Sequence, residues 1–187
     1  MQKLTVVITS TREGRIGGTI AEWFTALARR HGKFVIEVVD LKQLALPHLH
    51  EPNHPRKQQY LSEHTKAWSA QVAASDAFVF VVPEYNFSMP PAMLNALDYL
   101  YAEWNYKPAS FVSYGGVSGG LRSVQMAKQA LTALNMMPIV EAVALPFAAK
   151  QIDAQGVFVA GDSAERAATT MLDELVRWAA ALATLRS

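Results

Sequence analysis

The sequence predicts a three-layer α/β fold in which helices cover both faces of a doubly wound, five-stranded parallel sheet. Three observations support this: five strand-length apolar runs recur along the 187 residues, helical patterns separate them, and no Asn-Gly or Asp-Gly pair marks a hairpin. Parallel neighbours need a long crossover connection, usually a helix, whereas antiparallel neighbours need only a short turn. The alternation therefore favours a parallel sheet.

The expected strands are residues 4–9, 34–39, 77–82, 109–114 and 139–145. In the third run every position from Phe78 to Val82 is apolar, which indicates a strand buried on both faces. The second run contains Glu37 and is followed by Asp40, so we expect it at an edge of the sheet.

The expected helices are residues 16–27, 56–74, 91–105, 120–135 and 172–182. In the first and the last, apolar residues recur at spacings of three and four, which is typical of amphipathic helices. The third begins at Pro91, where a missing N–H costs little. Residues 41–55 contain three prolines, and we expect them to be irregular.

The composition predicts one domain spanning residues 1–187, because the chain is only slightly longer than a typical domain. The net charge is +1, from 17 Lys and Arg against 16 Asp and Glu, so we expect no nucleic-acid or membrane partner. The absence of Cys excludes disulfides and thiolate nucleophiles, and with no signal peptide in view it predicts a cytoplasmic protein. No apolar stretch reaches the roughly 18 residues of a membrane helix.

The segment after the first expected strand has the composition of a phosphate-binding loop. In a doubly wound sheet, ligands bind beyond the carboxyl ends of the strands. Residues 9–18 contain three hydroxyl side chains, two arginines and three glycines, and they lead into a helix. Hydroxyls, guanidinium groups and the free N–H groups of a helix N-terminus all bind phosphate oxygens. The alternative is ordinary helix capping by Ser or Thr, with glycine in a turn.

Two further segments follow the third and fourth expected strands. Residues 83–91 contain two aromatic rings and three prolines, a stiff surface on which a flat conjugated ring could lie. The alternative is that Tyr85 and Phe87 are packing residues. Residues 113–120 contain four glycines in six positions, which would let the backbone approach a ligand closely. The alternative there is a mobile linker.

Two motifs in these segments occur in a specific order. They are Pro83-Glu84-Tyr85-Asn86 followed by Asn95-Ala96-Leu97-Asp98-Tyr99, and Lys107-Pro108 leading through Phe111-Val112-Ser113-Tyr114 to Gly115-Gly116. With the first segment they resemble the NADPH-dependent FMN reductase family, flavodoxin-like proteins that include quinone, azo and chromate reductases. The resemblance spans most of the chain. It implies a sheet order of 2-1-3-4-5, FMN as cofactor, NADPH or NADH as electron donor, and a homodimer or homotetramer.

By position, the resemblance assigns FMN-binding roles in all three segments. The residues so assigned are Ser10, Thr11, Arg12, Arg15, Ile16 and Gly17 for the phosphate, Pro83, Glu84, Tyr85 and Asn86 for the isoalloxazine ring, and Ser113, Tyr114, Gly115 and Gly116 for its pyrimidine side. Many relatives have Gly where Thr9 and Ser88 stand and Lys where Leu94 stands. Ser88 would stiffen the second segment, and Leu94 would change how its helix meets a partner subunit.

The expected chemistry comes from the cofactor, because the three segments contain no histidine, no cysteine and no pair of carboxylates arranged for acid–base work. We expect a ping-pong reductase in which NAD(P)H reduces the flavin and a small-molecule acceptor then takes two electrons. Quinones, azo compounds, free flavins and metal oxyanions are the expected acceptors. Glu84 is given no catalytic role, and the N–H groups of Gly115 and Gly116 would balance negative charge on the ring.

Two other classes of protein stay open. A flavodoxin-type electron carrier would bind FMN and serve protein partners, although such carriers usually have an acidic docking face, which a net charge of +1 does not indicate. A flavin-free nucleotide- or phosphate-binding regulator would keep the fold and the first segment and lose the ring site. The intact motif over residues 83–86 makes the regulator the least favoured class.

Three features outside these motifs allow more than one interpretation. The irregular segment contains His48, His50, Glu51 and His54. These side chains could bind zinc or nickel, but their spacing matches no known ligand pattern, so we expect no metal. Trp104 and Tyr106 would either pack in the core or contact a neighbouring subunit and its flavin. Arg15 could alternatively bind the 2′-phosphate of NADPH.

Overall fold

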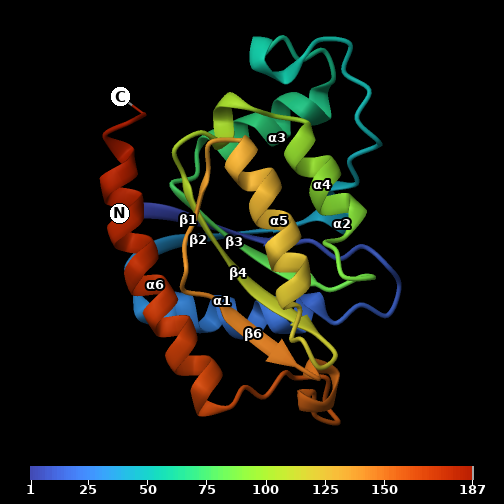
Figure 1. Ribbon diagram of the computed structural model, residues 1–187, viewed down its shortest axis with the longest axis vertical. Helices are drawn as coiled ribbons and strands as arrows, with labels where there is room; N and C mark the ends of the chain where they lie inside the picture. The colour runs from blue at the N-terminus through green and yellow to red at the C-terminus, as the bar shows by residue number, and fades with distance from the viewer. Residues whose placement is uncertain (187) are drawn as a thin grey trace.

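The computed structural model describes residues 1–186, and its strands form one six-stranded sheet (Figure 1). The strands are β1 (Gln2–Ile8), β2 (Phe34–Asp40), β3 (Ala77–Pro83), β4 (Pro108–Gly115), β5 (Met137–Pro138) and β6 (Val143–Pro146). All pairings between them are parallel, in the order β2-β1-β3-β4-β5, and β6 pairs with the carboxyl-end half of β4. The predicted fold class, the strand order and the edge position of β2 are confirmed.

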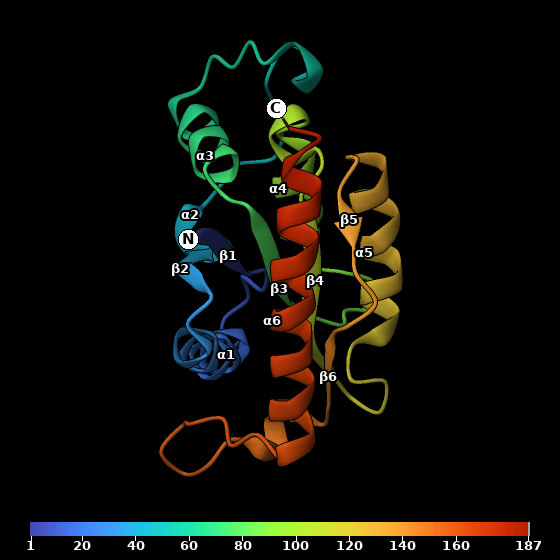
Figure 2. The same cartoon turned by 90° about the vertical axis from the view of Figure 1, so that its left-hand side faces the viewer.

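Helices cover both faces of this sheet. The five longer helices are α1 (Gly17–His31), α3 (Glu63–Ala73), α4 (Pro91–Asp98), α5 (Leu121–Ala133) and α6 (Asp162–Ala183). Helices α1 and α6 pack with Val6 and Val79 in one core, and α3, α4 and α5 pack with Val7 and Phe80 in the other. Figure 2 shows α1 and α5 on opposite sides of the strands, with α6 passing in front of them. Neighbouring residues of one strand enter different cores, so both faces of the strand are buried. This is why the strand sequences are apolar at consecutive positions.

The prediction of a single strand over residues 139–145 was wrong. Strand β5 pairs with the first residues of β4 and β6 pairs with its last residues, so the chain leaves the sheet between them. Pro138 has no N–H to donate to the ladder. Within the gap, the Ser110 hydroxyl of β4 donates to the Glu141 carbonyl at 2.5 Å. A side-chain hydrogen bond therefore takes the place of backbone pairing where the chain bulges.

Two predicted helices are shorter than expected. The helix predicted over residues 56–74 begins only at Glu63, after a separate 3₁₀ turn, η1 (Pro55–Lys57). The Glu51 carboxylate accepts hydrogen bonds from the N–H groups of Leu61 and Ser62 at 2.9 and 3.0 Å, which holds the chain in a non-helical path just before α3. Against the cost of burial, these bonds lower the pKa of Glu51 to about 2.

The helix predicted over residues 91–105 ends at Asp98, and a 3₁₀ turn, η2 (Ala102–Trp104), follows it. A four-residue helix, α2 (Leu41–Leu44), occupies the start of the segment expected to be irregular. The Asp40 side chain accepts a hydrogen bond from the Lys42 N–H at 3.0 Å and so caps α2. No helix within residues 1–186 is long and apolar enough to cross a membrane.

The Asn95–Tyr99 part of the first motif holds the irregular segment against α4. The Asn95 side chain donates to the Pro47 carbonyl at 2.8 Å and accepts from the Leu49 N–H at 2.9 Å. The Tyr99 hydroxyl donates to the same Pro47 carbonyl at 3.1 Å. These contacts give the motif a structural role that needs no ligand.

Trp104 is a core residue. Its side chain is fully buried, its ring centroid lies 5.0 Å from that of Phe78, and its Nε1 donates to the Leu97 carbonyl at 3.2 Å. Tyr106 is 40% exposed and lies just before β4, at the opposite end of that strand from Gly115. Trp104 was expected either to pack in the core or to contact a neighbouring subunit, and its burial shows that it packs in the core.

Candidate active site

Two buried hydroxyls lie at the carboxyl edge of the sheet. Ser10 follows β1 and is fully buried, and Tyr114 near the end of β4 is 5% exposed. Neither Ser10 Oγ nor the Tyr114 hydroxyl has a hydrogen-bond partner among residues 1–186. Burial raises the pKa of Tyr114 to about 12 although the nearby Ser10 hydroxyl acts to lower it, so the Tyr114 hydroxyl keeps its proton at neutral pH and can donate. Because buried polar groups are normally paired, these two hydroxyls indicate a site for a ligand with acceptor oxygens.

Gly17 leaves the space beside these hydroxyls open. A Cβ atom at this position would lie 2.6 Å from Ser10 Oγ and 2.7 Å from the Tyr114 hydroxyl oxygen, closer than atoms can pack. Gly17 is the first residue of α1, and no side chain of the described residues caps this helix or places an acid in its first turn. The free N–H groups of the helix and the two hydroxyls therefore form a cradle that fits a phosphate group.

The Arg15 guanidinium makes contacts within the protein. It donates to both carboxylate oxygens of Asp40, at the end of β2, and to the Ser10 carbonyl at 2.6 Å. The side chains of this pair are only 17% and 11% exposed. Burial by itself raises the pKa of Asp40, but the hydrogen bonds from Arg15 and from the Lys42 N–H, together with the positive charges of these two residues, outweigh it and leave the pKa lowered. Arg15 thus shapes the first segment around Ser10, while its bond to a phosphate of FMN or NADPH stays a prediction.

The other residues of the first segment differ in exposure. Thr9 is buried, and its N–H and hydroxyl both donate to the Val81 carbonyl, at 3.2 and 3.0 Å, so it joins β1 to β3. Ile16 packs against the core beside α1. Thr11 and Arg12 are exposed, and the Arg12 guanidinium donates to the Glu13 carbonyl at 3.1 Å. These two side chains face solvent beside the cradle.

Residues 85–88 form a tight turn. It is separated only by Glu84 from the end of β3, whose last residue, Pro83, is buried. The N–H of Tyr85 donates to the Ser88 carbonyl, and the N–H of Ser88 donates to the Tyr85 carbonyl, both at 2.9 Å. The two central residues are left-handed, with φ of 49° at Asn86 and 67° at Phe87. Glycine would therefore be favoured at Phe87, where φ is positive, and not at Ser88. Because Ser88 does not have a left-handed backbone, replacing glycine by serine there would not stiffen the turn in the way we expected.

Glu84 joins the second segment to the third. Its carboxylate accepts hydrogen bonds from the Ser118 hydroxyl at 2.7 Å, the Arg122 N–H at 3.2 Å and the Arg122 guanidinium at 2.9 Å. Burial by itself raises the pKa of Glu84, and these bonds together with the charge of Arg122 leave it lowered. Glu84 is therefore ionised at neutral pH and structural, which agrees with giving it no role in proton transfer.

The glycines of the third segment serve mainly its own packing. Gly120 has a φ of 85°, and a Cβ there would lie 2.7 Å from the Tyr114 nitrogen. The Ser113 hydroxyl donates to the Gly119 carbonyl at 2.8 Å, so it points into this loop. Such close packing argues against a mobile linker. Gly116 is different, because it is exposed and a Cβ there would meet no atom of the described residues within 4 Å, which leaves it open to a ligand.

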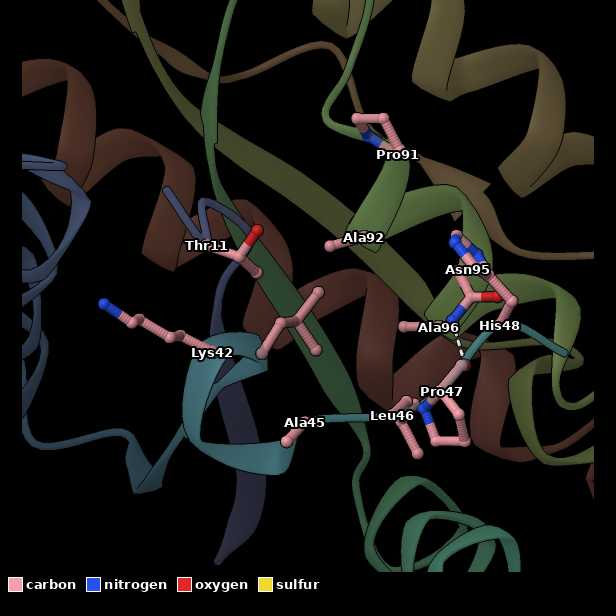
Figure 3. Close-up of a pocket in the computed structure, with 11 residues that line it drawn as sticks. Thr11, Lys42, Ala45, Leu46, Pro47, His48, Pro91, Ala92, Asn95 and Ala96 are labelled. Carbon is pink, nitrogen blue, oxygen red and sulfur yellow. Dashed lines mark hydrogen bonds between the residues drawn. The ribbon is translucent and has the colours of Figure 1, made fainter. Parts of the chain in front are cut away.

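A cavity of about 440 Å³ lies between α2, the following loop and α4 (Figure 3). Thr11 is the one residue with a predicted FMN role that lines it. Its walls are mainly apolar, and Figure 3 shows the Asn95 side chain bonded to Pro47 at one side of it. The cavity is therefore next to the phosphate cradle and does not include it.

The histidines of the irregular segment make no metal centre in the described part of the chain, where no group of three or more metal-ligating side chains comes together. His50 Nδ1 lies 3.3 Å from the Tyr99 hydroxyl, and His54 Nδ1 accepts from the Arg56 N–H at 3.2 Å. The Glu51 carboxylate accepts hydrogen bonds from the N–H groups of Leu61 and Ser62. These side chains stabilise the loop that contains them.

Sequence reasoning missed three residues that shape the site: Asp40, Ser118 and Arg122. Asp40 ends β2 at the carboxyl edge, so the rule that ligand sites lie at that edge could have identified it. Ser118 and Arg122 have no such signal. They are ordinary residues of a loop and a helix, and only the fold brings them to Glu84.

Comparison with known proteins agrees with this geometry. The sequence profile of the NADPH-dependent FMN reductase family matches residues 2–150. An NAD(P)H-dependent FMN reductase of Schizosaccharomyces pombe is 41% identical over 147 residues, which cover 77% of this chain and 74% of that protein. A quinone reductase of Pseudomonas putida is 29% identical over 137 residues, 70% of each chain.

Among solved structures, the flavoenzyme NAD(P)H:(acceptor) oxidoreductase FerB of Paracoccus denitrificans has a TM-score of 0.74 at 23% identity, with 96% of this chain and 97% of that chain covered. This similarity confirms the flavodoxin-like fold. The family match and the identity to the yeast relative confirm the enzyme class and the resemblance found in the motifs. The chain belongs to the NADPH-dependent FMN reductase family.

Proposed function

We propose that this protein is an FMN-dependent NAD(P)H oxidoreductase that passes two electrons by a ping-pong mechanism to a small acceptor. Quinones, azo compounds, free flavins and metal oxyanions are the proposed acceptors. The observation that supports FMN binding most directly is the pair of buried, unpartnered hydroxyls of Ser10 and Tyr114 beside Gly17. A phosphate group supplies the acceptor oxygens that these hydroxyls lack within residues 1–186.

In this proposal each segment binds one part of FMN. Ser10, the N–H groups at the start of α1 and solvent-facing Thr11 and Arg12 bind the phosphate. The residues proposed to contact the ring are Pro83, Glu84, Tyr85 and Asn86 on one side and Ser113, Tyr114, Gly115 and Gly116 on the other. Glu84 acts through its bonds to Ser118 and Arg122, which keep the second and third segments at a constant separation. When bound, FMN supplies the two-electron chemistry that these side chains lack.

The test is the visible spectrum of the purified protein after mixing with FMN and desalting, followed by anaerobic addition of NADPH or NADH. Retained flavin absorbance that bleaches on addition supports the reductase. Retained flavin that neither nucleotide bleaches would indicate an electron carrier instead. Loss of the flavin on desalting would contradict the FMN site itself.

We further propose a single FMN-binding domain over residues 1–187 that assembles as a homodimer or homotetramer in the cytoplasm. The exposed surface of α4 and α5 supports assembly, because Leu94, Leu121 and Met126 are 41%, 50% and 44% exposed. Apolar side chains that gather on a surface often mark a protein contact. Light scattering of the FMN-loaded protein measures the number of subunits.

Arg12→Ala is expected to weaken FMN binding by roughly 1.5 to 3 kcal/mol, the range of a hydrogen bond to a charged group. Arg12 is exposed and makes one hydrogen bond within the described residues, to the Glu13 carbonyl, so its removal should leave the fold intact. Fluorescence titration of FMN measures the loss. Unchanged affinity would remove Arg12 from the site.

Ser10→Ala is expected to weaken FMN binding by about 1 kcal/mol, as loss of a neutral hydroxyl donor does. The same change should not destabilise the protein without FMN, because Ser10 Oγ has no partner there among the described residues. FMN titration and thermal unfolding are measured together. A larger loss of affinity than for Arg12→Ala would reverse the order of the two contributions.

A further inference from the structure

Phe87 has a backbone conformation that its side chain disfavours. Its φ of 67° follows a φ of 49° at Asn86, and two hydrogen bonds between Tyr85 and Ser88 close the turn around them. Asn adopts the left-handed region readily, whereas a bulky aromatic residue there is an outlier. Strain of this kind persists where the surrounding structure imposes it, and it gathers at functional sites.

The Phe87 ring is exposed yet held in place. It is 64% exposed, and the Arg122 guanidinium carbon lies 4.2 Å from its ring centroid, a cation–π contact. Arg122 in turn donates to the Glu84 carboxylate at 2.9 Å, and Glu84 is 9% exposed. A buried carboxylate thus positions a guanidinium, which positions an aromatic ring at the surface. Burial does not explain the ring, because most of it faces solvent.

We propose that Phe87 forms one side of the acceptor site and selects flat, conjugated acceptors of the quinone class. The inference rests on the proposed function, because Phe87 directly follows Tyr85 and Asn86, which are proposed to contact the flavin ring. An aromatic ring fixed at the open side of this segment stacks on a planar acceptor and gives a non-planar one little contact. The reaction is NAD(P)H + H⁺ + quinone → NAD(P)⁺ + hydroquinone, with both electrons supplied by the nucleotide.

The experiment compares three variants of the FMN-loaded protein: Phe87→Gly, Phe87→Leu and Phe87→Tyr. With a naphthoquinone, KM should rise roughly three- to tenfold in Phe87→Gly and Phe87→Leu, the range of an aromatic stacking contact, and stay near the parent value in Phe87→Tyr. With ferricyanide, a non-aromatic acceptor, KM should change much less in all three. The ratio of the two KM changes is therefore the measured quantity.

Two measurements that do not depend on turnover accompany the comparison of KM values: the melting temperature and the dissociation constant of FMN. The melting temperature of Phe87→Gly should not fall below that of the parent, because glycine relieves the left-handed strain. The dissociation constant of FMN should stay within twofold. Gln58→Gly is the matched control, because Gln58 is also left-handed, with φ of 51°, and exposed, but follows η1 in a loop that contains none of the residues proposed to bind FMN. It should leave the quinone KM unchanged.

Several results would overturn this assignment. Equal KM changes for both acceptors would mean that Phe87 does not select planar molecules. Weaker FMN binding in Phe87→Gly would make Phe87 part of the flavin site, and a change in subunit number would make it an interface residue. A parent protein that retains FMN and oxidises NAD(P)H while Phe87→Gly keeps the parent quinone KM contradicts this inference alone. A parent that retains no FMN contradicts the proposed function as well.

Discussion

Gly17→Ala is expected to weaken FMN binding more than a hundredfold. The new Cβ would lie 2.6 Å from Ser10 Oγ and 2.7 Å from the Tyr114 hydroxyl, so both hydroxyls must move away from the phosphate cradle. Two hydroxyl hydrogen bonds at about 1 kcal/mol each, and about 1 kcal/mol more for displacing the phosphate from the N-terminus of α1, give a loss of about 3 kcal/mol, which is more than a hundredfold in affinity. Titration of the purified variant with FMN, followed by flavin fluorescence, measures the change.

Gly18→Ala is the matched control for this experiment. Gly18 is the next residue of α1, and a Cβ there would meet no atom of residues 1–186 within 4 Å. Alanine in place of glycine should stabilise the helix by up to about 1 kcal/mol without altering FMN affinity. If Gly17→Ala bound FMN as tightly as Gly18→Ala, the phosphate would not lie between Ser10, Gly17 and Tyr114.

Asp40→Ala is expected to lower the free energy of unfolding by about 2 to 4 kcal/mol. The change leaves the mostly buried Arg15 guanidinium without its carboxylate partner and removes the cap of α2. Losing one partner of a buried ion pair costs about 3 to 5 kcal/mol, somewhat less where the pair is partly exposed, and losing a helix cap costs about 1 kcal/mol. Urea unfolding monitored by circular dichroism measures the difference.

Glu13→Gln is the control for the ion-pair argument. Glu13 pairs with Lys42 at 2.6 Å, but its side chain is 92% exposed, so its removal should leave the free energy of unfolding nearly unchanged. A loss similar to that of Asp40→Ala would mean that any charge change in this region unfolds it. Equal stability of Asp40→Ala and the parent would contradict the role of the Arg15–Asp40 pair.

The same pair predicts a pH dependence. The pKa of Asp40 is lowered in the folded protein from its ordinary value of 3.8, so its contribution to stability is present above that pH and is lost as the pH falls through the lower, folded value. Asp40→Asn should therefore unfold with a shallower dependence on pH below about 4 than the parent. Urea midpoints measured between pH 3 and pH 7 would test this, and parallel curves would contradict it.

Much of the fold could be predicted because the relevant signals are local. The apolar positions of Phe78 to Val82 are buried in both cores, as an unbroken run indicates, and Glu37 and Asp40 lie on an edge strand. The errors come from contacts between distant residues. Glu51 delays the start of α3 through Leu61 and Ser62, and the Ser110 hydroxyl occupies the carbonyl of Glu141 where one continuous strand was expected.

By itself, the sequence determined the parallel α/β class and the family, and it predicted the three segments proposed to bind FMN, because residue type and order along the chain are enough for these. Tertiary structure alone decided which side chains are available to a ligand. It shows that the Arg15 guanidinium already pairs with Asp40 and that the Ser113 hydroxyl already donates to the Gly119 carbonyl. Tyr114 and Ser10 lie next to each other without partners in the described chain, because two strands far apart in sequence end at one edge. Hydrogen-bonding capacity depends on neighbours that the fold supplies, and a linear pattern does not encode them.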